Sequence, residues 1–158
     1  MEKNEKDFML QAIEVASDNV KKAGGGPFGA IIVKDGKIVA VAHNTVTTTN
    51  DPTAHAEVNA IREACKNLNT FQLDGCDIYS SCEPCPMCLS AIYWARLKNV
   101  YFAASRYDAE DAGFDDSFIY NELAKKVEDR TVKIQQILPE EGKEPFNVWA
   151  KFEQKINY

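Results

Sequence analysis

Two short segments contain the residue types that can bind a metal ion and move a proton. They are His55-Ala56-Glu57 and Pro84-Cys85-Pro86-Met87-Cys88. One neutral imidazole and two thiolates supply three ligands, so a tetrahedral zinc ion would keep its fourth position for water. Zinc lowers the pKa of such a water from about 15.7 to about 7, which makes hydroxide available at neutral pH. We therefore expect His55, Cys85 and Cys88 to bind one Zn²⁺.

Glu57 is the candidate acid–base residue. It follows the expected histidine ligand closely enough to lie beside the metal without binding it. A carboxylate there can accept a proton from water and return it to a ring nitrogen. The pattern H-x-E followed by P-C-x-x-C is typical of zinc enzymes that deaminate nucleobases, whereas each half alone is a weak signal. The chain has only two histidines, so a three-histidine site is excluded, and we interpret His43 as structural.

Cys82 permits a different interpretation. Together with Cys85, Cys88 and His55 it could complete a closed zinc site of three cysteines and one histidine, which would make the protein a binding module instead of an enzyme. Against this, helical spacing pairs only Cys85 with Cys88. Cys82 precedes Pro84, where the chain is expected to be extended, and a closed site would leave Glu57 without a role.

The hydrophobic pattern predicts the elements that position these segments. A helix is expected over about 8–20, ending at three consecutive glycines, and a second one is expected from Pro52 with Asp51 as its cap. Asp35-Gly36 predicts a hairpin turn. Strands are expected at 30–33, 38–41, 77–80, 99–104 and 131–138, and the later helices at about 86–96, 118–125 and 145–155.

These elements predict an α/β fold. The first two strands must be antiparallel, whereas strand–helix–strand connections of this length favour parallel crossovers. The expected architecture is a three-layer α/β/α sandwich around a mixed five-stranded sheet, in a single domain over residues 1–158.

Composition and charge limit the expected class of substrate and the expected cellular location. The 158 residues are 45% hydrophobic with a net charge of −6, and no stretch is apolar enough to span a membrane. Binding to a phosphate backbone needs a basic surface, so a nucleic-acid partner is not expected and a small uncharged substrate is favoured. The start of the chain has no secretory pattern. The five cysteines are then expected in a reducing cytoplasm, where metal binding is a more common role than disulfides.

With these motifs located, the sequence resembles the cytidine-deaminase superfamily, and within it the small bacterial guanine deaminases. The resemblance runs from about Ala12 to Tyr158. The segments shared with several branches, including tRNA adenosine deaminases, are Gly26-Pro27-Phe28-Gly29-Ala30, residues 50–57 and residues 82–88. Residues 112–120 and a C-terminus ending in Tyr158 suggest the guanine branch.

The resemblance implies hydrolysis of guanine to xanthine and ammonia, with deamination of tRNA adenosine, of cytosine or of a nucleoside as alternatives. It implies that Asp116 helps to move a proton to the departing amino group. Phe28, Asn44 and Trp94 would line the base-binding pocket and Tyr158 would help to close it. From the residues alone, Phe28 and Trp94 could equally be core aromatics and Asn44 a turn residue, and a helix cap is the alternative for Asp116. The resemblance also implies a homodimer, in which the C-terminal helix at about 144–158 either packs on its own subunit or is exchanged with a partner.

Overall fold

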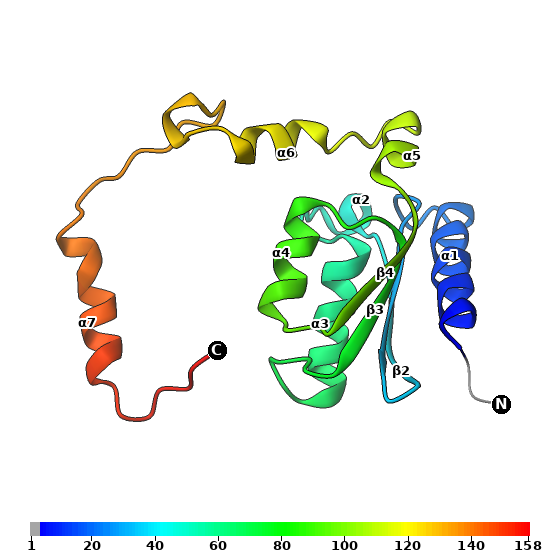
Figure 1. The fold of residues 1–158 in the computed structure, drawn as a ribbon, viewed down its shortest axis with the longest axis horizontal. Coiled ribbons are helices and arrows are strands. Elements are labelled where there is room, and N and C mark those ends of the chain that lie inside the picture. The colour runs from blue at the N-terminus through cyan, green and yellow to red at the C-terminus, as the bar shows by residue number, and fades with distance from the viewer. Residues whose placement is uncertain (1–3) are drawn as a thin grey trace. The chain divides into compact units, whose positions relative to one another are not determined.

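The computed structural model describes residues 4–158, which form two compact units. One unit runs up to Asp116 and the other from Ser117 to Tyr158 (Figure 1). Residues 1–3 of the predicted domain lie outside the described part. The prediction that residues 1–158 form a single domain therefore stays a prediction.

The first unit is built on a four-stranded mixed sheet. Its strands are β1 (Gly29–Lys34), β2 (Lys37–His43), β3 (Cys76–Cys82) and β4 (Asn99–Ala104), in the order β2-β1-β3-β4. β1 is antiparallel to β2 and to β3, whereas β3 and β4 are parallel. β3 is therefore a central strand, bonded on both sides, and it leads directly into the cysteine segment.

The predicted hairpin between β1 and β2 is confirmed. Asp35 and Gly36 both have positive φ angles, 49° and 73°, as a type I′ turn requires. Ile31 and Ile32 are both fully buried. Because successive strand residues point to opposite faces, β1 must be covered on both sides.

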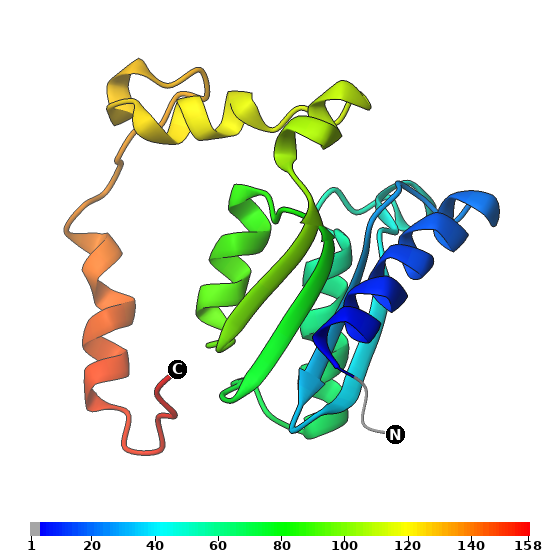
Figure 2. The same cartoon turned by 45° about the vertical axis from the view of Figure 1, so that its right-hand side comes forward.

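Helices cover both faces of the sheet (Figure 2). On one face, α1 (Glu5–Lys21) packs Phe8 and Ala12 against Ile31 and Tyr79. On the other face, α3 (Ala56–Leu68) and α4 (Pro86–Trp94) pack into a cluster with Ile32 and Ile78. The predicted three-layer α/β/α architecture with a mixed sheet is confirmed.

The prediction that the second helix starts at Pro52 is wrong, because α3 begins at Ala56. The Asp51 carboxylate instead accepts hydrogen bonds from the backbone N–H and the hydroxyl of Thr53, at 2.8 and 2.6 Å. This closes a local turn. The preceding stretch contains the short helix α2 (Val46–Thr49), which ends at Asn50 in the left-handed conformation.

The fifth strand predicted at 131–138 is also wrong, and the sheet has four strands. The second unit contains α6 (Ser117–Ala124), the 3-10 turns Val127–Asp129 and Glu141–Lys143, and α7 (Glu144–Lys151). Residues 131–138 lie between them without regular structure, and the backbone N–H of Thr131 bonds to the Glu122 carboxylate. An apolar alternation can favour a strand, but it cannot supply the neighbouring strand that a ladder needs.

A short helix that the sequence did not predict, α5 (Arg106–Asp111), follows β4. Ser105 and Asp108 form a capping box at its start. In residues 4–158 no helix is both long and apolar enough to cross a membrane.

Candidate metal centre

The candidate ligands lie where two helices begin. His55 is the N-cap residue of α3 and Cys85 that of α4, and both have extended backbone angles. Neither side chain caps its own helix, so both remain available to bind a metal ion. Pro86 occupies the first turn of α4, where its missing N–H costs nothing. A helix N-terminus favours a thiolate over a thiol, which suits Cys85 to a cation.

The ligand atoms of His55, Cys85 and Cys88 lie together. The Nδ1 atom of His55 is 3.6 Å from the Cys85 sulfur and 3.4 Å from the Cys88 sulfur, and all three atoms lie within 4.8 Å of one another. A tetrahedral zinc ion, with bonds of ~2.0 Å to nitrogen and ~2.3 Å to sulfur, would hold these atoms about 3.5 Å apart. The three residues therefore fit one zinc ion in both donor type and spacing.

The electrostatics of the group also suit a cation. Hydrogen bonding to Cys88, and then to His55, lowers the pKa of the Cys85 thiol to about 4. The hydrogen bond with Cys85, followed by burial, raises the pKa of Cys88. Hydrogen bonding to Cys85 also raises the pKa of His55, against the opposing effect of burial. The cluster thus concentrates negative charge on sulfur beside an imidazole.

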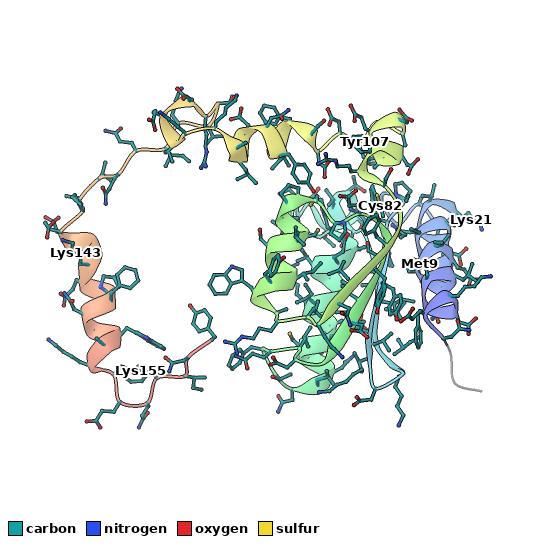
Figure 3. All side chains as sticks on the ribbon, viewed as in Figure 1. Met9, Lys21, Cys82, Tyr107, Lys143 and Lys155 are labelled. Atoms are coloured by element: carbon teal, nitrogen blue, oxygen red, sulfur yellow. The ribbon has the colours of Figure 1, made fainter. Side chains whose placement is uncertain are left out.

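Cys82 has a different environment. It ends β3 and is buried near the start of α5 (Figure 3), where its thiol donates to the Ser105 carbonyl at 3.6 Å. Burial raises its pKa to about 11. Next to it, Glu83 bonds through its backbone N–H to the Ala104 carbonyl and through its carboxylate to the Arg106 N–H. Cys82 is outside the group of possible metal ligands found among the described residues, so the geometry disfavours the closed site.

Glu57 lies beside the ligands in the first turn of α3. Its side chain is buried, and burial raises its pKa. Its two carboxylate oxygens have different neighbours. Oε1 accepts a hydrogen bond from the Ser80 hydroxyl at 2.9 Å, whereas Oε2 lies 3.4 Å from the Cys88 sulfur. One oxygen is thus anchored to β3, and the other faces the metal ligands.

Asn44 is buried after the end of β2, against the loop formed by Gly24, Gly25 and Gly26, here called the glycine loop. Its side-chain oxygen accepts hydrogen bonds from the backbone N–H groups of Gly26 and Val46, at 3.3 and 3.2 Å. Asn19 of α1 donates from Nδ2 to the carbonyls of Gly26 and Asn44, at 2.9 and 2.8 Å. A Cβ on Gly25 would lie 2.4 Å from the Asn44 carbonyl, and Gly25 has a φ of 147°. Only glycine therefore lets this loop approach Asn44.

Phe28 follows the glycine loop and is half-buried. Its ring contacts the Phe114 ring edge-on, with centroids 5.0 Å apart. The sequence did not single out Phe114, because it comes from a segment without a regular hydrophobic pattern.

The other three predicted site residues are more dispersed. Asp116 is half-buried, and burial together with the negative charge of Cys85 raises its pKa. Trp94 is the last residue of α4 and is 71% exposed. Trp94 lies nine positions after Cys85 along the helix, a rise of about 13 Å. Tyr158 ends the second unit and is 76% exposed. The roles of all three residues stay predictions.

Apart from Phe114, two further residues were not singled out from the sequence, Ser80 and Asn19. Each carried a usable signal, namely a polar residue on an otherwise buried face. Ser80 continues the alternation of Cys76 and Ile78 on β3. Asn19 follows Ala12 and Ala16 of α1 at helical spacing, and all four buried residues of that helix share this face.

Comparisons with known proteins agree with this geometry. Residues 2–104 match the family model of the cytidine and deoxycytidylate deaminase zinc-binding region. The guanine deaminase of Bacillus subtilis is 56% identical over 155 residues, which are 98% of this chain and 99% of that protein. The X-ray structure of guanine deaminase from that organism superposes with a TM-score of 0.96 at 55% identity, covering 99% of both chains.

A tRNA-specific adenosine deaminase from Aquifex aeolicus is 46% identical over 99 residues, covering 63% of this chain and 66% of that protein. The family match covers most of the first unit, including both metal-ligand segments. This chain therefore belongs to the cytidine and deoxycytidylate deaminase family, whose members share a zinc-binding region.

Proposed function

We propose that this protein is a zinc-dependent hydrolase that converts guanine and water into xanthine and ammonia. The observation that carries the proposal is the grouping of His55, Cys85 and Cys88 with the buried Glu57 carboxylate beside them. Similarity to a guanine deaminase along nearly the whole chain supports guanine as the base.

The chain's own residues supply the binding and the proton transfers. Zinc held by His55 Nδ1 and the sulfurs of Cys85 and Cys88 would act as a Lewis acid that makes a bound water acidic near neutral pH. Glu57 accepts the proton of the attacking water through Oε2, the oxygen on the side of the ligands. It delivers this proton to the ring nitrogen next to C2. The bond from C2 to the water oxygen forms. Glu57 or Asp116 then moves the remaining hydroxyl proton to the exocyclic amino group, the bond from C2 to that nitrogen breaks, and ammonia leaves as the C2 carbonyl of xanthine forms.

The orientation of Asn44 suits a base that presents a hydrogen-bond acceptor to it. Two backbone N–H groups bond to its Oδ1 atom and so fix which end of the amide is oxygen. Asn44 therefore offers a ligand the donors on Nδ2. We propose that the keto oxygen at C6 of guanine accepts such a hydrogen bond. Phe28 or Trp94 is proposed to stack on the planar base, and Tyr158 to help enclose it.

A panel of substrates tests the proposal. We expect ammonia release from guanine to exceed that from adenine, cytosine, their nucleosides and tRNA by at least about 10²-fold, because a mispaired buried donor or acceptor is costly. Chelation should abolish the activity and Zn²⁺ should restore it. Faster release from tRNA adenosine would instead support the alternative tRNA deaminase function, which the net charge of −6 disfavours.

We further propose a homodimer. No residue from Ser117 to Tyr158 is buried, and α7 leaves Phe146, Val148 and Trp149 at 74%, 58% and 41% exposure. Exposed apolar side chains at this density are typical of protein interfaces. Light scattering of the purified protein should give the mass of two chains, and a monomer mass at all concentrations would refute the dimer. The cytoplasmic location stays a prediction from the sequence.

A further inference from the structure

Ser80 is buried beside the candidate acid–base residue. Ser80 is only 2% exposed on β3, and its hydroxyl donates to Oε1 of Glu57 at 2.9 Å. We infer that Ser80 is a positioning residue that holds the Glu57 carboxylate by Oε1, so that Oε2 carries the proton during deamination. This inference rests on the proposed function.

The two oxygens of Glu57 would be equivalent without such an anchor, because rotation about the last side-chain bond exchanges them. The side chain begins in the first turn of α3 and is buried, so its backbone end is already fixed. A hydroxyl that donates to a carboxylate forms a charge-assisted hydrogen bond. It fixes the remaining rotation and leaves Oε2 on the side of Cys88.

Ser80 is itself held firmly. It lies in β3 opposite Ala30 of β1 on one side and Phe102 of β4 on the other, so both neighbouring strands determine where its hydroxyl lies. The next residue, Ser81, points to the other face and accepts a hydrogen bond from the Gly29 N–H at 3.0 Å. Of these two consecutive serines, Ser80 is therefore the one that can act on Glu57.

The expected consequence is a loss in the chemical step. A general base displaced by about 1 Å can cost on the order of 10²-fold in rate. The contacts of the Ser80 hydroxyl are with Glu57 and not with His55, Cys85 or Cys88. Removing the hydroxyl should therefore lower kcat, while KM and zinc content change little.

Ser80→Thr and Ser80→Val form the matched test, because threonine and valine have nearly the same shape and differ in the hydroxyl. We expect Ser80→Val to lower kcat by roughly 10-fold or more relative to Ser80→Thr, with zinc per subunit equal in both. Equal kcat values would overturn the inference. If the added methyl group prevents folding of both variants, Ser80→Ala against the unchanged protein gives the same comparison without added volume.

Repeating the pair in a Glu57→Gln background shows whether Ser80 acts through Glu57. Once the carboxylate is gone, Ser80→Thr and Ser80→Val should differ by less than about twofold. A persistent tenfold difference would show that the hydroxyl acts elsewhere and would overturn the inference. The proposed function fails separately, if the unchanged protein does not deaminate guanine. In that case the variants are compared on whichever base of the panel is turned over.

Discussion

The two units of this chain differ in how far they bury their apolar side chains. The unit up to Asp116 fully buries Ile31, Ile32 and Ile78 and contains the candidate ligands with Glu57. The unit from Ser117 to Tyr158 buries no residue. The family model matches residues 2–104, which lie in the first unit, whereas the match to the guanine deaminase of Bacillus subtilis covers 98% of the chain. We therefore propose that the packed sheet positions the chemistry and that the later segment contributes to selectivity.

The largest expected effect comes from removing a metal ligand in the packed unit. Cys88→Ala should lose zinc, and its rate should fall toward that of the uncatalysed reaction, a loss on the order of 10⁶-fold. Cys82→Ala is the matched control, since the Cys82 thiol bonds to the Ser105 carbonyl. It should keep zinc and turnover. Elemental analysis measures the zinc content and ammonia release measures the turnover. Loss of zinc in Cys82→Ala would support the closed zinc site of three cysteines and one histidine.

Glu57→Gln should separate metal binding from proton transfer within the same unit. Because Glu57 is outside the ligand group, the variant should keep zinc, but kcat should fall on the order of 10²-fold or more. Glu63→Gln, at an exposed glutamate of the same helix, should leave kcat unchanged. A near-normal rate in Glu57→Gln would remove Glu57 from the mechanism.

Tyr158 tests whether the second unit contributes to selectivity. Tyr158→Ala should lower kcat/KM for guanine by about 10-fold, equivalent to about 1.4 kcal/mol of lost aromatic contact. Zinc content and melting temperature should be preserved, because Tyr158 is 76% exposed. Lys155→Ala, a nearby exposed change, serves as the control. Unchanged kinetics would place selectivity within the first unit.

Asn19 is expected to have the smallest effect. Asn19→Ala removes the two hydrogen bonds that hold Gly26 and Asn44, and KM should rise several-fold while zinc is retained. Each lost bond should cost about 1 kcal/mol of stability. Asn67→Ala also removes an asparagine bond to a backbone carbonyl, that of Val39 at 2.8 Å. It should affect thermal stability alone, so an equal rise in KM would contradict the role given to Asn19.

The sequence was most informative where local spacing decides the outcome. The Asp35-Gly36 turn, α1 and the start of α4 follow from residues close together in the chain. The sequence was less informative where the local structure depends on a residue far away in the chain. Residues 131–138 have no neighbouring strand, whereas the error at Asp51 has a local cause, its bond to Thr53. Ser80 and Asn19 carried a polar signal on a buried face, but their partners lie 23 and 25 residues away.

The sequence by itself determined the donor set, because the residue types and spacing of His55, Cys85 and Cys88 suit one zinc ion. It also determined the layered α/β fold through hydrophobic periodicity. Only the tertiary structure decided that Cys82 lies outside the ligand group and that Ser80 anchors Glu57. The physical reason is that periodicity specifies which face of an element is buried, whereas packing of the elements determines which side chains meet there.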